Sequence, residues 1–169
     1  TIFKKLKLDC IYINDKPNGR NINLNCGSLF PDKLKKKVLS KSADFGISFD
    51  GDGDRLICCD ELGNIIDGDK ILACLINFFN TKHKINSVVG TLMSNKGFEE
   101  FVNDLSVKFY RSKVGDRFVY DLMKKKKSFI GGEQSGHIIL RNFGPSGDGI
   151  LIATYLLMII SLNDKSVSN

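Results

Sequence analysis

Two apolar segments flank an acidic loop in residues 45–59, which read Phe45-Gly46-Ile47-Ser48-Phe49, then Asp50-Gly51-Asp52-Gly53-Asp54-Arg55, then Leu56-Ile57-Cys58-Cys59. The first segment alternates large apolar residues with small ones, and the last is a short apolar run. Both patterns are typical of β-strands. Turn residues follow at 61–64, so strands at 55–60 and 64–66 are predicted to form a hairpin.

The acidic loop carries three carboxylates at every second position, separated by glycine. Carboxylates this close repel one another, and glycine gives the backbone the freedom to turn them inward. Mg²⁺ prefers oxygen ligands and often meets phosphate in its remaining positions. The sequence therefore predicts that Asp50, Asp52 and Asp54 bind Mg²⁺, with Arg55 contacting a phosphorylated ligand.

Two other structures would use a similar sequence. A plain acidic surface turn would also use Asp and Gly, but it needs no evenly spaced carboxylates between strands. An EF-hand would place Glu61 at its last ligand position. That reading fails because Arg55 stands where the EF-hand needs glycine and because the flanking segments are not helical.

The composition is that of a soluble globular protein, with 42% hydrophobic and 26% charged residues among 169. The longest apolar run, residues 150–160, is too short to span a bilayer and predicts a buried helix. The amino end lacks the pattern of a signal peptide. Five cysteines without a C-x-x-C pair indicate neither a disulfide framework nor a zinc site, so a cytoplasmic location is expected.

The net charge of +6 raises nucleic acid as a partner. The lysines, however, gather at 33–37 and 124–127, where a helix would end or expose a face, and lysine near a helix C-terminus complements the helix dipole. Basic residues are not interleaved with aromatic ones in the pattern that stacks bases. We therefore expect neither a nucleic-acid nor a membrane partner.

Helical and strand patterns alternate along most of the chain. Strands are predicted at 10–13, 44–49, 55–60, 64–66, 87–90, 108–111, 128–131 and 137–140. Helices are predicted at 31–40, 70–79, 98–105, 117–125 and 148–162, with Asp67 as an N-cap. This alternation predicts an α/β fold with mixed, largely parallel sheets and flanking helices. The change of pattern at residue 67 is the candidate domain boundary.

In such folds ligands bind at the carboxyl ends of strands. Residues 112–117, Ser-Lys-Val-Gly-Asp-Arg, follow a strand and open a helix, which suits an anionic group near Lys113. Residues 131–137, Gly-Gly-Glu-Gln-Ser-Gly-His, offer a carboxylate, a hydroxyl and an imidazole, which suit sugar hydroxyls. Taken alone, Lys113 could equally be a solvated charge and His137 a satisfied strand residue. Residues 91–95 predict a polar turn with a helix cap at Ser94 or Asn95.

Three motifs in this order resemble the α-D-phosphohexomutase superfamily: 50–55, 113–117 and 132–137. Residues 17–23, 90–95 and 147–149 resemble its phosphoglucosamine mutase branch more than its phosphomannomutase or phosphoglucomutase branches. The resemblance implies conversion of glucosamine 6-phosphate to glucosamine 1-phosphate, on the bacterial route to UDP-N-acetylglucosamine and peptidoglycan, with Mg²⁺ and a phosphoserine.

The resemblance also implies roles for individual residues. Arg55 would contact phosphate and Lys113 would assist proton transfer or steady the attacking sugar oxygen. Substrate contacts would come from Glu133, Ser135, His137, Asp116 and Arg117. The phosphoserine loop and the distal phosphate-binding loop of the superfamily do not occur in this sequence.

Residues 1–66 would then be the later part of the second superfamily domain and 67–169 most of the third. We expect a fragment whose partners are a sugar phosphate and the remaining domains of the same enzyme, and which is inactive alone. The alternatives are another phosphohexomutase, either a phosphomannomutase or a phosphoglucomutase, and a non-catalytic module that binds metal and sugar phosphate.

Overall fold

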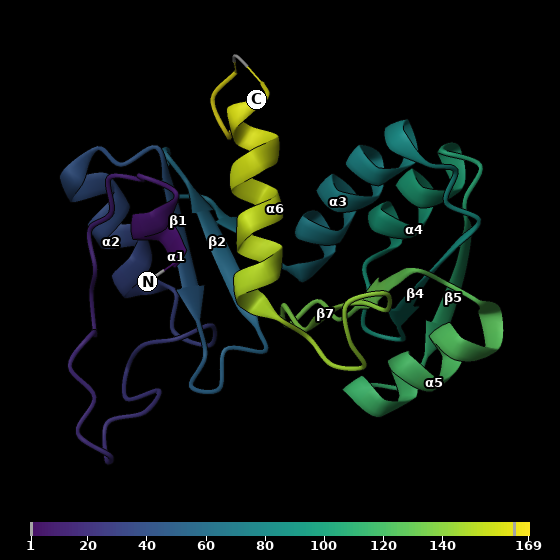
Figure 1. The fold of residues 1–169 in the computed structure, drawn as a ribbon, viewed down its shortest axis with the longest axis horizontal. Coiled ribbons are helices and arrows are strands. Elements are labelled where there is room, and N and C mark those ends of the chain that lie inside the picture. Colours follow the sequence, from purple (N-terminus) through teal and green to yellow (C-terminus); the bar gives the residue numbers. More distant parts are fainter. Residues whose placement is uncertain (1, 164) are drawn as a thin grey trace.

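The computed structural model describes residues 2–163 and 165–169, and it contains two β-sheets with helices on their faces (Figure 1). The helices are α1 (Ile2–Lys5), α2 (Asp32–Lys41), α3 (Gly68–Lys82), α4 (Lys96–Asp104), α5 (Asp116–Lys126) and α6 (Gly149–Ser161). The strands are β1 (Phe45–Phe49), β2 (Leu56–Asp60), β3 (Ile65–Ile66), β4 (Ser87–Thr91), β5 (Lys108–Ser112), β6 (Ile130–Gly132) and β7 (Ile138–Leu140). The predicted α/β class with flanking helices is confirmed.

The first sheet has the order β1-β2-β3 and is antiparallel throughout. Its register pairs Phe49 with Leu56, so the acidic loop connects two neighbouring strands at one end of the sheet. Helix α2 covers one face through Leu34 and Val38, which cluster with Cys59. The loop is thus anchored at both ends by paired strands.

The second sheet has the order β5-β4-β6-β7, in which β4 is parallel to β5 and β6 while β7 is antiparallel to β6. Val119 and Met123 of α5 pack on one face, and α3 and α4 contribute to the core on the other. Parallel pairs are confined to this sheet. In the first sheet the predicted hairpin is confirmed, since β2 and β3 pair antiparallel across a short connection.

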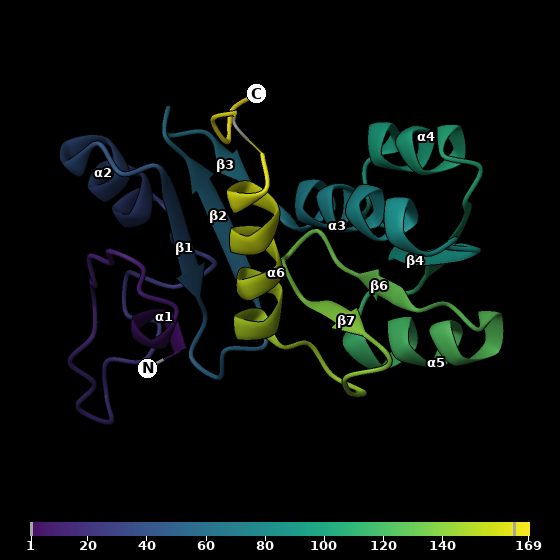
Figure 2. The ribbon, with the colours of Figure 1, turned by 45° about the horizontal axis from the view of Figure 1, so that its top comes forward.

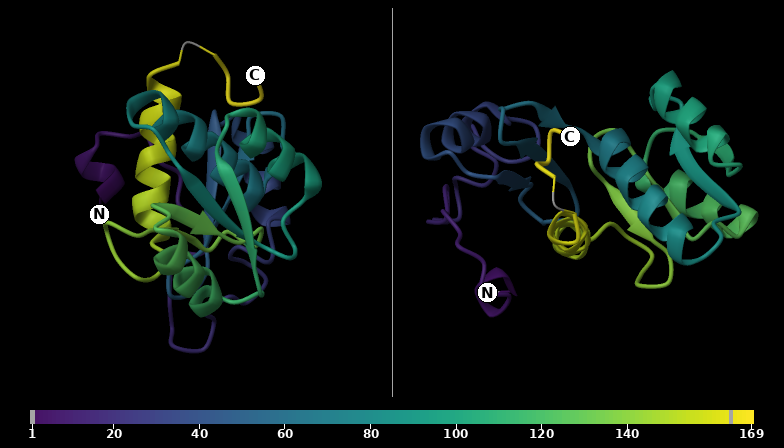
Figure 3. Two further views of the ribbon diagram at one scale, coloured as in Figure 1. Left: turned by 90° about the vertical axis from the view of Figure 1, so that its right-hand side faces the viewer. Right: turned by 90° about the horizontal axis from the view of Figure 1, so that it is seen from above.

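Helix α6 stands between the two sheets (Figures 1 and 3). Figure 2 shows β3 on one side of it and β6 and β7 on the other. One hydrophobic core joins these parts, since Leu56 of β2, Leu72 of α3 and Ile152 of α6 belong to the same buried cluster. The domain boundary at residue 67 stays a prediction, and the main core extends across it.

The predicted strand at 10–13 is wrong, because these residues form neither helix nor strand. Ile11 and Tyr12 are both exposed, so this apolar run does not reach the core. A strand also needs a partner for its backbone hydrogen bonds, and no described strand pairs with this segment. The short helix α1 was not predicted. The other predicted elements are present, with ends shifted by at most three residues.

The apolar run at 150–160 lies within α6, as predicted, and packs against α3 and β2. None of the helices in the described part of the chain combines the length and hydropathy needed to cross a membrane.

Candidate functional site

The three carboxylates of the acidic loop converge. Asp50, Asp52 and Asp54 each offer one oxygen, and these oxygens all lie within 4.8 Å of one another. The N–H of Gly53 donates to the carbonyl of Asp50 at 3.3 Å, which closes the turn that brings the side chains together. An all-oxygen, all-anionic donor set of this kind fits a hard divalent cation such as Mg²⁺.

Arg55 offsets part of the negative charge. Its backbone N–H donates to Asp50 Oδ1 at 3.2 Å, and its Nε lies 3.7 Å from Asp50 Oδ2 and 3.9 Å from Asp54 Oδ1. Burial raises the pKa of the Asp54 carboxyl, His137 opposes the shift, and the carboxylates of Asp50 and Asp52 add to it. A bound cation would remove this cost of crowding ionised carboxylates.

The loop at 132–137 packs directly against the acidic loop. The N–H of Leu56 donates to the carbonyl of Gly136 at 3.2 Å, and Arg55 forms an antiparallel bridge with His137. Gly136 has φ of +94°, and a Cβ there would overlap the carbonyl of Leu56. Only glycine permits both the backbone conformation and this close approach.

His137 is 1% exposed and links the acidic loop to a third segment. Its Nε2 accepts the N–H of Gly147 at 3.2 Å and lies 3.3 Å from Asp54 Oδ2. The nitrogen can serve one partner at a time, because accepting the amide proton needs its lone pair while donating to the carboxylate needs a proton. The N–H of Gly149 donates to the carbonyl of Gly53 at 2.8 Å, which holds this third segment against the acidic loop.

Glu133 connects the site to the loop after β5. It is 8% exposed, and its Oε1 accepts the N–H of Gly115 at 2.8 Å. The structure therefore brings together the three motifs at 50–55, 113–117 and 132–137, which are far apart in the sequence. Sequence reasoning missed the contact of Gly147 with His137, because a glycine between polar residues carries no signal of its partner.

The remaining predicted substrate residues lie at the surface of the same region. Ser135 is half-buried, while Lys113, Asp116 and Arg117 are exposed. The Lys113 ammonium lies 5.9 Å from the centre of the Phe118 ring, and the Asp116 carboxylate accepts the N–H of Arg117 at 2.7 Å. Their roles, like those of the other site residues, stay predictions.

The loop at 91–95 has a structural function. The Asn95 side chain caps α4 by accepting the N–H of Phe98 at 2.7 Å, in agreement with the predicted cap. Arg111 donates to two carbonyls of the loop at 2.9 and 2.8 Å and to Glu99 at 2.9 Å. The buried carboxylate of Asp69 accepts the N–H of Asn95 at 2.8 Å. These bonds hold the turn in place through protein groups.

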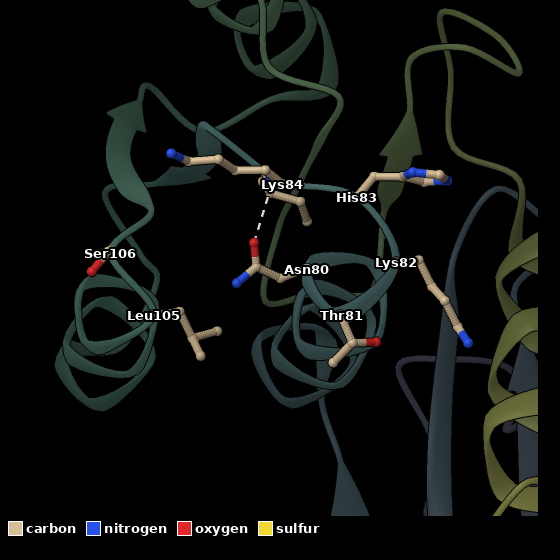
Figure 4. Close-up of a pocket in the computed structure, with 8 residues that line it drawn as sticks. Asn80, Thr81, Lys82, His83, Lys84, Leu105 and Ser106 are labelled. Carbon is tan, nitrogen blue, oxygen red and sulfur yellow. Dashed lines mark hydrogen bonds between the residues drawn. The ribbon is translucent and has the colours of Figure 1, made fainter.

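A cavity of about 400 Å³ lies at the far end of α3 from the 132–137 loop, where α3 and α4 both end. Residues 80–85, Leu105 and Ser106 line it. In Figure 4 the side chains of Lys82 and Lys84 extend in different directions. The side-chain oxygen of Asn80, Oδ1, accepts the N–H of Ile85 at 3.1 Å. The cationic groups do not converge on one ligand, so this cavity is not the candidate site.

The comparisons with known proteins identify the family of the chain. A family model described as phosphoglucomutase/phosphomannomutase, alpha/beta/alpha domain III, matches residues 67–169. The chain belongs to this family. Phosphohexomutases of this type are isomerases, and the predicted family resemblance is confirmed.

Curated relatives are named phosphoglucosamine mutase. The protein of Fusobacterium nucleatum is 48% identical over 168 residues, which are 98% of this chain and 37% of that protein. The protein of Nautilia profundicola is 45% identical over 170 residues, covering 99% of this chain and 39% of that protein. This phosphohexomutase chain thus spans less than two fifths of the length of these relatives.

Solved structures show the same fold. A phosphoglucomutase/phosphomannomutase family protein from Burkholderia thailandensis superposes with a TM-score of 0.75 at 22% identity, over 82% of this chain and 30% of that one. The Aspergillus fumigatus N-acetylphosphoglucosamine mutase, solved in complex with GlcNAc-6P and magnesium, superposes with a TM-score of 0.64 at 19% identity. This superposition covers 88% of this chain and 40% of the Aspergillus fumigatus chain.

Proposed function

We propose that this chain forms the metal-binding and sugar-binding part of a phosphoglucosamine mutase, which interconverts glucosamine 6-phosphate and glucosamine 1-phosphate. The observation that carries the proposal is the convergence of the acidic loop, the 132–137 loop and the 147–149 segment through backbone hydrogen bonds. The names of the relatives support the choice of sugar.

In this proposal Asp50, Asp52 and Asp54 hold Mg²⁺, whose chemistry is the neutralisation of charge on a phosphoryl group. The orphaned, buried Oδ1 of Asp54 supports the assignment, because it has no hydrogen-bond partner among the described residues. Arg55 contributes a fixed positive charge beside the metal ligands. The phosphoryl group would come from a phosphoserine supplied by another part of the enzyme.

The sugar would lie over the 132–137 loop. Oε1 of Glu133 accepts the N–H of Gly115, which fixes the carboxylate, and Oε2 would accept a hydrogen bond from a sugar hydroxyl. Ser135 would add a second hydroxyl contact and His137 would stand beside it, with Asp116 and Arg117 at the rim. Lys113 would assist proton transfer at the attacking oxygen, since it is exposed and free to reorient towards a bound sugar.

Phosphoryl transfer needs in-line positioning of the reacting groups as well as charge neutralisation. The loops of this chain would supply the metal and sugar contacts, whereas the phosphoserine would come from another part of the enzyme. We therefore propose that the chain acts with the remaining domains of the same enzyme and is inactive alone. The five cysteines are free thiols, which supports the cytoplasm as the place of action.

The test is a chimera in which this chain replaces the corresponding 37% of the Fusobacterium nucleatum protein. We expect the chimera to convert glucosamine 6-phosphate in the presence of Mg²⁺ and the unjoined chain of 169 residues to give no turnover. Product formation is followed by chromatography of the two sugar phosphates.

Parallel reactions with glucose 6-phosphate and mannose 6-phosphate serve as the specificity control. A preference for either of them would assign the chain to a phosphoglucomutase or phosphomannomutase. A chimera that is folded, binds Mg²⁺ and converts none of the three sugars would favour a non-catalytic binding module. Turnover by the unjoined chain would contradict the proposed need for further domains.

A further inference from the structure

A second cavity, of about 210 Å³, lies beside the acidic loop. It is lined by Asn23, Cys26, Ser28, Leu29, Asp50 and Arg55. One wall therefore comes from the irregular segment at 23–29, and the other comes from the two ends of the acidic loop.

The segment at 23–29 is packed tightly onto the end of β1. A Cβ at Gly27, whose φ is +85°, would lie 3.3 Å from the carbonyl oxygen of Phe49, the residue before Asp50. The N–H of Phe30 donates to the carbonyl of Gly27 at 3.1 Å, which closes a turn around the wall. The wall is thus positioned by the same strand that positions the metal ligands.

Ser28 is the unusual residue of this cavity. It is 6% exposed, and its Oγ is buried without a hydrogen-bond partner among the described residues. Arg55 Nε, on the opposite wall, is also buried without a hydrogen-bond partner. A buried hydroxyl left unpaired is costly, so a ligand that accepts a hydrogen bond would satisfy it.

The chemistry of the walls points to one class of ligand. A hydroxyl donor and a guanidinium favour an oxyanion, and Asp50 at the cavity edge makes that binding depend on a cation in the acidic loop. A tetrahedral phosphoryl group bridging to a divalent cation meets both requirements. Ser28 and Arg55 both line the cavity in which such a group would lie.

We propose that Ser28 is a phosphoryl-binding residue whose Oγ donates to an oxygen of a phosphoryl group lodged between the 23–29 segment and Arg55. The inference rests on the proposed function for the identity of the anion. It adds Ser28 and the 23–29 segment to the site, neither of which belongs to the acidic loop or to the 132–137 loop.

The first test measures binding of inorganic phosphate to the 169-residue chain at saturating Mg²⁺, by ³¹P nuclear magnetic resonance titration. Ser28→Ala should weaken phosphate binding about tenfold, the effect of one hydrogen bond to a charged group. Mg²⁺ affinity should be unchanged. Ser40→Ala, an exposed serine on α2, is the matched control and should leave both affinities unchanged.

The melting temperature of Ser28→Ala distinguishes phosphoryl binding from a structural role for Ser28. Because Oγ has no protein partner, Ser28→Ala should not lower the melting temperature, whereas loss of a structural hydrogen bond would lower it. A lower melting temperature with unchanged phosphate affinity would overturn the proposal.

A second measurement uses the unaltered chain. Cys26 lines the cavity and is half-buried, so bound phosphate with Mg²⁺ should slow its alkylation by iodoacetamide. Cys10 and Cys74 are equally half-buried but do not line this cavity, and they serve as internal controls in peptide mass spectrometry. Equal alkylation of Cys26 with and without phosphate would count against the proposal.

The two proposals fail separately. Phosphate binding that is insensitive to Ser28→Ala, in a chimera that still converts glucosamine 6-phosphate, would overturn only the role of Ser28. Phosphate binding that depends on Ser28, in a chimera without turnover, would overturn only the mutase proposal. No detectable phosphate binding at saturating Mg²⁺ would overturn the phosphoryl pocket.

Discussion

Asp52→Asn is expected to weaken Mg²⁺ binding at least about 100-fold, since loss of a direct ligand should exceed the loss caused by removing a supporting residue around a metal site. Asp52 is the exposed member of the three carboxylates, whereas Asp50 and Asp54 are half-buried and contact Arg55. The substitution removes one negative charge from the donor set and disturbs little else. Its effect on metal affinity should therefore not be an effect on folding.

The affinity is measured by isothermal titration calorimetry on the 169-residue chain. A melting curve with and without Mg²⁺ provides a second readout, because a ligand that binds only the folded state raises its stability. Asp104→Asn, an exposed carboxylate at the end of α4, is the matched control and should bind Mg²⁺ as the unaltered chain does. Equal affinities for the two variants would remove the acidic loop from the metal site.

Gly136→Ala is expected to destabilise the fold by about 3 kcal/mol, the sum of an unfavourable backbone conformation and the displacement of a neighbouring chain. Gly136 has φ of +94°, and its new Cβ would overlap the carbonyl and approach the amide nitrogen of Leu56. These are backbone atoms of a buried strand, so they cannot rotate away as a side chain would. Leu56 also donates its N–H to the carbonyl of Gly136, so the clash would strain the hydrogen bond that joins the acidic loop to the 132–137 loop.

Two control glycines separate the components of this effect. Gly19 has φ of +78° with nothing within 4 Å of a built Cβ, so Gly19→Ala reports the conformational cost alone, about 1 kcal/mol. Gly144 has open space and no positive φ, so Gly144→Ala should change the free energy of unfolding little. Chemical denaturation gives the three values. A loss for Gly136→Ala no larger than that for Gly19→Ala would contradict the close approach of the two loops.

Local chemistry explains why many elements were predictable. The alternation in residues 45–49, the N-caps at Asp67 and Asn95 and the apolar run within α6 each determine an element through contacts or hydrogen bonds among near neighbours. At residues 10–13 the local pattern was not enough to predict the structure. Its apolar residues suit a strand, but a strand forms only where a second chain segment accepts and donates the backbone hydrogen bonds.

The site also has a part that near neighbours in the sequence determine and a part that depends on distant segments. The spacing of Asp50, Asp52 and Asp54 within one loop was enough to predict a cation site, because neighbouring residues must share a small volume. The residues that surround this loop were beyond a local pattern. The residues next to His137 do not indicate that it will lie 3.3 Å from Asp54. The residues next to Ser28 do not indicate that its hydroxyl will be buried in a cavity that Arg55 also lines.

From residue 31 onward the sequence by itself thus determined the order of helices and strands, and it determined the acidic loop and the family to which the motifs belong. The tertiary structure alone decided which loops meet. Those meetings depend on backbone hydrogen bonds between distant segments, such as Leu56 with Gly136 and Gly149 with Gly53. Such bonds require the two sheets and α6 to be packed around one core, so the physical cause of the site lies in that packing.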